Sequence, residues 1–243
     1  AKIIIVDMSD PEYVKDRMNI NQVVEIFDHH FGHEDFWREQ LGAKSHIEKV
    51  GSCATLIFEE FEKKKMQIST LTANLLYTAI FSNTLNFNAG VSCDRDRLAF
   101  KELKKYTDLP NSWEEIYYSE LSRDVFINPR EALIKVIKTS NISGHKETFI
   151  IGQLELWNSK EFIINNKELI KKVLSSKNSD FWFFTAPSIS EGKNYVLCQN
   201  KKLQNILSSI IGVTFRSNMG VTNKLWLRKE ILRELQNFTV SNV

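Results

Sequence analysis

The first thirty residues alternate between short apolar runs and polar stretches in the order strand, helix, strand. Residues 2–6 and 23–27 are short, apolar and rich in β-branched side chains, and a polar stretch of helical length, residues 11–19, separates them. Each apolar run ends in an acid, Asp7 or Asp28. This order is typical of a parallel α/β sheet, in which the carboxyl ends of neighbouring strands meet at one edge. We therefore expect Asp7 and Asp28 to share that edge.

The rest of the first 122 residues has a mainly helical pattern. A looser segment over residues 31–44 and a short strand over residues 46–50 come first. Apolar residues at helical spacing then predict four helices, which cover residues 51–65, 71–82, 94–106 and 113–121. We expect residues 1–122 to form one domain around the parallel sheet.

A second α/β pattern begins after an expected linker at residues 122–128. Its predicted strands cover residues 148–156, 180–185 and 195–198. Its predicted helices cover residues 129–137, 167–174, 203–211 and 226–235. We therefore predict a second, smaller α/β domain over residues 129–243, which gives an α/β fold class for both halves of the chain.

Composition excludes several classes of protein. The chain has 243 residues, 42% of them hydrophobic, and a formal net charge of +2, as a globular protein has. The near-neutral charge gives no support for a nucleic-acid or membrane-surface partner, and no apolar run reaches the roughly 18 residues of a membrane span. The three cysteines match no zinc spacing, and their odd number favours a reducing compartment, the cytoplasm.

The tripeptide Asp28-His29-His30 directly follows a predicted strand and carries the first candidate chemistry. A carboxylate beside neutral imidazoles suits a divalent first-row metal. A short motif also arises by chance, and a polar loop with solvated histidines explains the tripeptide equally well. Asp7 favours the metal, because at the end of the adjacent strand its carboxylate could bridge two ions.

Four segments in this order resemble the DHH phosphoesterases that carry a DHH-associated second domain: residues 6–7, 26–30, 50–56 and 78–87. That family includes manganese-dependent inorganic pyrophosphatases, exopolyphosphatases and prune-like phosphodiesterases. Residues 51–55 are nearer to the exopolyphosphatase and prune-like branch, and residues 79–85 are nearer to the pyrophosphatases. The resemblance extends over essentially the whole chain.

The resemblance implies a role for each matched residue of the first domain. Asp7 matches a carboxylate that bridges two metals, His29 a metal-ligand histidine, and His30 a histidine that contacts substrate phosphate. Asp28 would support them, so Asp7, Asp28 and His30 are the expected catalytic residues. Asn83 stands where the pyrophosphatases place a metal-binding Asp. Its amide oxygen can ligate a hard cation but carries no charge, so a second metal should bind more weakly.

The second domain offers a basic pair near its end. Arg228-Lys229 resembles the family's Ser-Arg-Lys phosphate-binding motif, with Leu227 in place of the Ser. A planar guanidinium beside an ammonium group suits phosphate oxygens. Two basic residues on an amphipathic helix are, on their own, more often a solvated face.

A lysine completes the expected phosphate site. Lys138 precedes a turn that contains Gly144, and it resembles the family's other phosphate-binding lysine. Lys135 and Lys146 are alternatives for the same role.

Gly51-Ser52 opens a predicted helix and has two interpretations. Backbone N–H groups at a helix start can bind an anion, but a serine there more often caps the helix. We favour capping. We also expect the neighbouring Cys53 to be a packed residue, because no base stands beside it in the sequence.

The resemblance implies hydrolysis of pyrophosphate or polyphosphate in a cleft between the two domains of the chain. It also implies that the protein forms a homodimer. The cofactor would be Mn²⁺ or Mg²⁺ in a two-metal site. Family members begin with a strand and a His-x-x-x-Asp-x-Asp loop that supplies further metal ligands, and these 243 residues contain no such loop. We expect a truncated chain or a separate segment that supplies those ligands.

Two alternatives remain. A catalytically impaired relative could act as a phosphate- or nucleotide-binding or regulatory module. Other DHH branches are nucleases or cyclic-dinucleotide phosphodiesterases, which carry a glycine-rich substrate motif. The nearest feature of that kind here is Asn218-Met219-Gly220, and we place this interpretation last.

Overall fold

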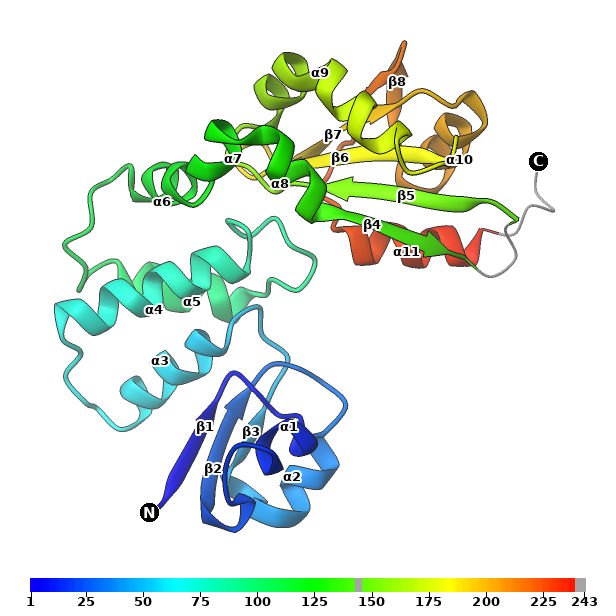
Figure 1. Ribbon diagram of the computed structural model, residues 1–243. Helices are drawn as coiled ribbons and strands as arrows, with labels where there is room; N and C mark the ends of the chain where they lie inside the picture. The colour runs from blue at the N-terminus through cyan, green and yellow to red at the C-terminus, as the bar shows by residue number, and fades with distance from the viewer. Residues whose placement is uncertain (143–145, 239–243) are drawn as a thin grey trace. The chain divides into compact units, whose positions relative to one another are not determined.

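The chain folds into two compact units, Ala1–Asn111 and Ser112–Val243, in a computed structural model that describes residues 1–142 and 146–238 (Figure 1). Each unit combines helices with a β-sheet, so the predicted α/β class is confirmed. Where a linker was expected, the structure has a short helix, α7 (Arg123–Ile127). None of the described helices is long and apolar enough to cross a membrane.

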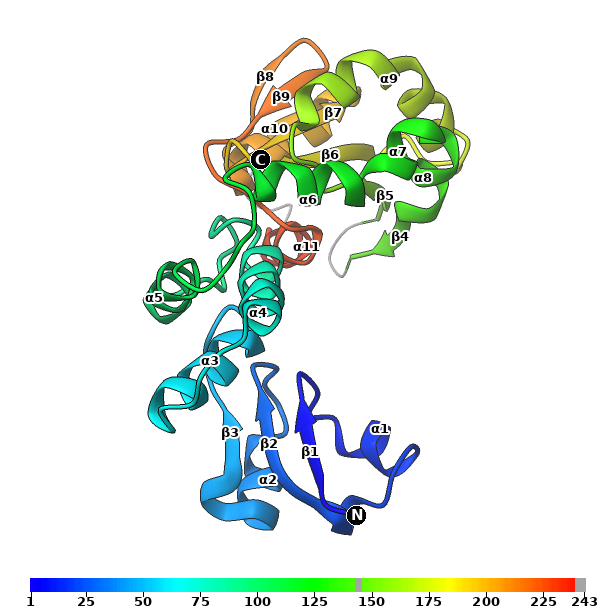
Figure 2. The same ribbon diagram turned by 90° about the vertical axis from the view of Figure 1, so that its left-hand side faces the viewer.

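The first unit contains a three-stranded parallel sheet in the order β1-β2-β3 (Figure 2). Its strands are β1 (Ile3–Val6), β2 (Val23–Asp28) and β3 (Ser45–Ile47). The crossover from β1 to β2 includes helix α1 (Pro11–Lys15) and a 3₁₀ turn (Ile20–Gln22). Asp10 caps α1 by accepting from the amide of Glu12, and Pro11 occupies the first turn, where its missing N–H costs nothing.

Helices cover both faces of this sheet. On one face lies α2 (Glu34–Leu41), followed by a second 3₁₀ turn (Gly42–Lys44). This helix was not predicted, because the segment is mostly polar and Trp37 is its only fully buried side chain. On the other face lies α3 (Cys53–Lys63), against which α4 (Thr70–Asn83) and α5 (Asp94–Leu103) pack.

The second unit contains a six-stranded mixed sheet in the order β4-β5-β6-β7-β9-β8. The strands are β4 (Ile137–Asn141), β5 (Thr148–Gln153), β6 (Trp182–Ser188), β7 (Lys193–Cys198), β8 (Thr214–Arg216) and β9 (Met219–Val221). Only β5 and β6 are parallel among these pairs. The edge strand β4 and the β8–β9 hairpin were not predicted. Strand β4 is short and mostly polar, and β8 and β9 are too short to show an alternating pattern.

Helices pack on both faces of this sheet (Figure 1). The helices α8 (Pro129–Val136) and α9 (Ser159–Ser175) lie on one face, and α10 (Lys201–Ile211) and α11 (Arg228–Asn237) lie on the other. Helix α6 (Trp113–Leu121) precedes α7 at the start of the unit.

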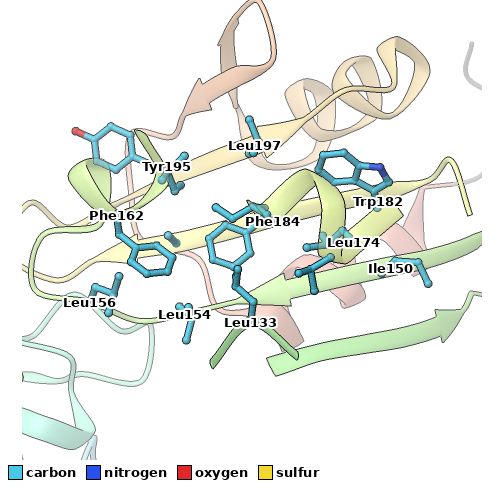
Figure 3. Close-up of a cluster of buried hydrophobic side chains, with 14 residues drawn as sticks. Leu133, Ile150, Leu154, Leu156, Phe162, Leu174, Trp182, Phe184, Tyr195 and Leu197 are labelled. Carbon is cyan, nitrogen blue, oxygen red and sulfur yellow. The ribbon is translucent and has the colours of Figure 1, made fainter. Parts of the chain in front are cut away.

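Strand alternation divides the core of the second unit into two layers. On the α9 face, Ile150, Phe184 and Phe162 pack in one cluster, shown in Figure 3. On the α11 face, Ile151 and Phe183 pack against the other two helices. Because neighbouring residues of a strand point to opposite faces, polar residues at alternate positions can be assigned to one face or the other.

Candidate metal centre

Four potential ligands meet at the carboxyl edge of the small parallel sheet. Asp28 is the last residue of β2, and Asp7 follows β1, whose Val6 pairs with Phe27. With His29 and His30, these acids offer one ligand atom each within 4.8 Å of one another. The two acids therefore share one edge, as the strand pattern predicts.

Asp7 has an unusual backbone. Its φ is 63°, in the left-handed region that Asp tolerates better than most residues. Its amide still donates to the carbonyl of Phe27 at 2.9 Å, so the strand pairing continues to this residue. The chain then turns away, and the carboxylate stays half exposed beside His29.

The Asp28 carboxyl is fully buried and shapes the turn that follows it. Its Oδ1 accepts from the amide of His29 at 2.7 Å, the amide of His30 at 3.2 Å and Nδ1 of the His30 ring at 2.8 Å. Burial alone would raise the pKa of this carboxyl, but the nearby Ser9 hydroxyl, the His30 ring and the two amides lower it below the usual value. Asp28 is therefore held as a carboxylate.

The second carboxylate oxygen of Asp28 has a different environment. Oδ2 is buried and has no hydrogen-bond partner. A buried carboxylate oxygen normally has one, because an unpaired polar group in the interior costs free energy. A cation bound beside this oxygen would supply the missing partner.

His29 is held between a carbonyl and a carboxylate. Its Nδ1–H donates to the carbonyl of Val50 at 3.1 Å, and its Nε2 lies 3.2 Å from Oδ1 of Asp7. With Nδ1 protonated, a neutral ring directs its Nε2 lone pair at a carboxylate oxygen, and two acceptors repel at that distance. A proton or a cation between them removes the repulsion. The Asp7 hydrogen bond accordingly raises the pKa of His29, although burial opposes the shift.

His30 has an exposed ring on a fixed backbone. Its Nδ1 donates to Asp28, and its side chain is 64% exposed. The Ser9 hydroxyl donates to the carbonyl of His30 at 3.2 Å, and the Trp37 indole fixes Ser9 by donating to its carbonyl at 2.6 Å. Sequence reasoning missed Ser9, since its sequence position is that of an ordinary turn residue.

These contacts fit a divalent cation. The site contains two carboxylates and two imidazoles, a donor set for a first-row metal. The carbonyl of Val50 fixes the ring of His29, which is the usual arrangement for a metal-binding histidine. Asp28 contributes an unpartnered oxygen and Asp7 a half-exposed one.

The segment after Val50, the residue that binds the His29 ring, is fixed by the buried acid Asp96. The amides of Gly51 and Cys93 each donate to Oδ2 of Asp96 at 2.8 Å, and the Thr55 hydroxyl donates to Oδ1 at 2.6 Å. A Cβ on Gly51 would lie 2.7 Å from Asp96 Oδ2 and 2.8 Å from Cγ2 of Thr84, so only glycine fits. Asp96 thus holds the residue next to Val50, whose carbonyl orients His29.

Ser52 caps α3, as predicted. Its Oγ accepts from the amide of Ala54 at 3.3 Å, and its side chain is fully buried. Asn83, expected as a metal ligand, is the last residue of α4, and its Nδ2 donates to the same Ser52 Oγ at 3.2 Å. The structure therefore places Asn83 beside the start of α3.

Cys53 is packed rather than reactive, in agreement with the sequence interpretation. Its thiol donates to the carbonyl of Phe27 at 3.2 Å, and burial raises its pKa to about 12. A thiol with that pKa contains almost no thiolate near neutral pH and is a poor nucleophile.

The basic residues expected to bind phosphate lie in the second unit. Arg228 and Lys229 form the first turn of α11. Lys138 lies in β4 opposite Ile151, so its side chain is on the sheet face that α11 covers. Nη1 of Arg228 donates to the carbonyl of Val136 at 2.7 Å, two residues before Lys138.

The alternative lysines lie elsewhere. Lys135 is in the last turn of α8, which packs on the opposite face of the sheet. Lys146 is exposed and precedes β5. The turn at Gly144 lies outside the described residues.

Comparisons with known proteins bear on this geometry. No protein-family model matches the chain. The manganese-dependent inorganic pyrophosphatase of Bacillus subtilis is 23% identical over 231 residues, which are 94% of this chain and 74% of that protein. The manganese-dependent inorganic pyrophosphatase of Methanocaldococcus jannaschii is 26% identical over an alignment of 223 residues that covers 83% of this chain and 69% of that protein.

A solved structure shares the fold. It is the crystal structure of a protein assigned to family II inorganic pyrophosphatases from Methanococcus jannaschii, with a TM-score of 0.51 and 22% identity. The match covers 97% of this chain and 79% of that one. The resemblance inferred from the motifs is thus confirmed: over most of its length this chain is similar to manganese-dependent inorganic pyrophosphatases.

Proposed function

We propose that this protein hydrolyses phosphoanhydrides, inorganic pyrophosphate or polyphosphate, with a divalent cation held by Asp7, Asp28 and His29 and with His30 beside it for substrate phosphate. The observation that carries the proposal is the cluster itself, four ligand atoms within 4.8 Å of one another. The similarity to manganese-dependent inorganic pyrophosphatases over most of the chain supports it.

The side chains of the cluster have different roles in this proposal. Asp28 orients both histidines through Oδ1, and its Oδ2, which has no hydrogen-bond partner, would bind the cation. Because Nδ1 of His30 is bound to Asp28, its Nε2 is left for a phosphate oxygen. A divalent cation bound here supplies charge neutralisation for phosphate oxygens and lowers the pKa of water toward neutrality.

The second unit contributes positive charge. Lys138, Arg228 and Lys229 bind the phosphate groups of the substrate in this proposal. The support is their place on one sheet face together with the match to the family motif. Arg228 already donates one N–H to Val136, and its remaining donors can bind phosphate.

We propose Mn²⁺ or Mg²⁺ as the cation. The imidazole of His29 among the proposed ligands favours Mn²⁺, since Mg²⁺ takes oxygen ligands almost exclusively. The relatives that are named manganese-dependent support the same choice.

Phosphate release from pyrophosphate in the presence of Mn²⁺ tests the proposal. The Asp7→Ala variant should lose on the order of a hundredfold in kcat, the usual effect of removing one charge-stabilising group. Asp10→Ala is the matched control, because Asp10 is exposed and caps α1 outside the cluster. Release by the wild-type protein no faster than by Asp7→Ala would contradict the proposal.

One observation favours a second candidate, a relative that binds phosphate without hydrolysing it. Asn83 brings no charge, and its amide donates to Ser52. If this residue limits the site, Asn83→Asp should raise the affinity for Mn²⁺ and the rate of phosphate release together. Pyrophosphate binding without release in both proteins would support the binding module instead.

A further inference from the structure

A fully buried asparagine in the second unit has every polar group of its side chain engaged. Nδ2 of Asn194 donates to the Thr185 hydroxyl at 2.7 Å and to the carbonyl of Trp226 at 2.8 Å. Its Oδ1 accepts from the amide of Trp226 at 2.8 Å. One side chain therefore bonds both backbone groups of Trp226, as a neighbouring strand would.

The backbone of Asn194 is attached to the same segment. Its amide donates to the hydroxyl of Thr222 at 2.7 Å, and its carbonyl accepts from the amide of Thr222 at 3.0 Å. Thr222 is buried, and its hydroxyl donates onward to the carbonyl of Lys224 at 2.6 Å. Asn194 thus joins β7 to both ends of the stretch from Thr222 to Trp226.

This stretch needs such support, because residues 222–227 form neither helix nor strand. An irregular segment has no hydrogen-bond ladder of its own, so its position depends on individual side-chain bonds. It leads directly into α11, whose first two residues are Arg228 and Lys229.

The start of α11 is also held from the other side. The guanidinium of Arg228 donates to the carbonyl of Val136 at the end of α8. Leu227, just before the helix, donates its amide to Glu230 at 2.7 Å. The Asn194 bonds fix the chain before the basic pair, and the Val136 bond fixes the side chain of Arg228 itself.

We propose that Asn194 is a positioning residue for phosphate binding: it fixes residues 222–227 so that Arg228 and Lys229 are held ready for substrate. The inference rests on the proposed phosphate-binding role of that pair. Without Asn194 the segment must be ordered when substrate binds, and the entropy of ordering weakens binding. The metal cluster in the first unit is untouched, so turnover of bound substrate persists.

The test compares Asn194→Ala with Gln204→Ala in the full protein. Gln204 is a matched control, since it is also a buried amide of the second unit and donates to two carbonyls, those of Cys198 and Ser217. Both variants lose a buried amide. Only Asn194→Ala should raise KM for pyrophosphate, by about tenfold or more, with a smaller change in kcat.

Hydrogen exchange gives a readout that does not depend on activity. The amide of Trp226 should exchange faster in Asn194→Ala than in the wild-type protein, and Gln204→Ala should leave it protected. If Asn194→Ala does not fold, Thr222→Val removes the hydroxyl that accepts from Asn194 with little change in shape, and it should give the same KM effect in smaller measure.

The outcomes separate the two proposals. Equal KM values and equal Trp226 protection in the Asn194 and Gln204 variants would overturn the role of Asn194. A wild-type protein that neither binds nor hydrolyses pyrophosphate would overturn the proposed function, and the phosphate role of Asn194 with it. Faster Trp226 exchange in that case would leave Asn194 with a structural role alone.

Discussion

Within the turn Asp28-His29-His30, each side chain uses its two polar atoms for different purposes. Asp28 holds the histidines with one oxygen and leaves the other unpartnered, and His29 binds Val50 with one nitrogen and faces Asp7 with the other. Residue types and strand ends were enough to predict that these side chains meet. The carbonyl of Val50 could not be predicted, because a backbone group leaves no trace in the residue type.

The protonation of His29 should make the proposed metal binding depend on pH. The Asp7 carboxylate is the largest influence on this ring and raises its pKa above the ordinary 6.5. The protonated form persists as pH rises until that raised pKa is passed, and only the neutral ring can ligate a metal. The affinity for Mn²⁺ should therefore increase as pH rises through the raised pKa, with release of a proton on binding.

Calorimetric titration of Mn²⁺ in buffers of different ionisation enthalpy measures both quantities. His46→Gln is the control, because His46 contacts Glu25 outside the cluster and should leave the pH profile unchanged. An affinity that stays constant between about pH 6 and pH 8 would contradict this account of His29.

Helices and strands with a strong periodic pattern of apolar residues were predicted well. Those that form because of their contacts with other parts of the chain were not. Helix α6 has the predicted bounds, and β1 and β2 lie where the apolar runs predict them. Helix α2 was missed because one tryptophan anchors it, and β4 was missed because a polar edge strand is defined by its pairing with β5. Lys138 could therefore not be placed on a sheet face from sequence.

The two serine caps of the first unit should differ in strength. Ser52 accepts from Ala54 at the start of α3 and is buried, whereas Ser69 accepts from Thr72 at the start of α4 and is exposed. Ser69→Ala should lower the free energy of unfolding by about 0.5–1 kcal/mol. Ser52→Ala should cost about 1–2 kcal/mol, since no water replaces the lost bond in the interior.

Urea-induced unfolding of both variants measures this difference. A larger loss of stability in Ser69→Ala than in Ser52→Ala would contradict the assignment of Ser52 as a buried cap.

The chain consists of two α/β units, and each contains part of the residue set that we propose to be functional. The proposed metal ligands lie in the first unit, and the basic residues proposed to bind phosphate lie in the second. The α/β class followed from the alternation of apolar and helical patterns, which each unit has. The hydrogen bonds of Asn194 could not be predicted from the sequence. Its partners Thr185, Thr222 and Trp226 are far apart in sequence, and only the fold brings them together.

The reactivity of the three cysteines tests the packing of both units. Cys53 in the first unit and Cys198 in the second are buried, and burial raises the pKa of each thiol to about 12. Cys93 is only partly buried. Alkylation with iodoacetamide near neutral pH should therefore modify Cys93 first. Cys53 and Cys198 should react only as fast as the units that bury them unfold.

Mass spectrometry of partly alkylated protein identifies the modified residues. Early modification of Cys53 would show that α3 opens against the sheet of the first unit, contrary to the packing described above. Addition of urea should bring all three rates together, which serves as the internal control.

Mn²⁺ binding to His29→Gln tests most directly whether Asp7, Asp28 and His29 hold a divalent cation, as we propose. His46→Gln is the matched control, a partly buried histidine outside the cluster. We expect the wild-type protein and His46→Gln to bind Mn²⁺ alike, and His29→Gln to bind it about tenfold to a hundredfold more weakly. Equal Mn²⁺ affinities in all three proteins would contradict the assignment.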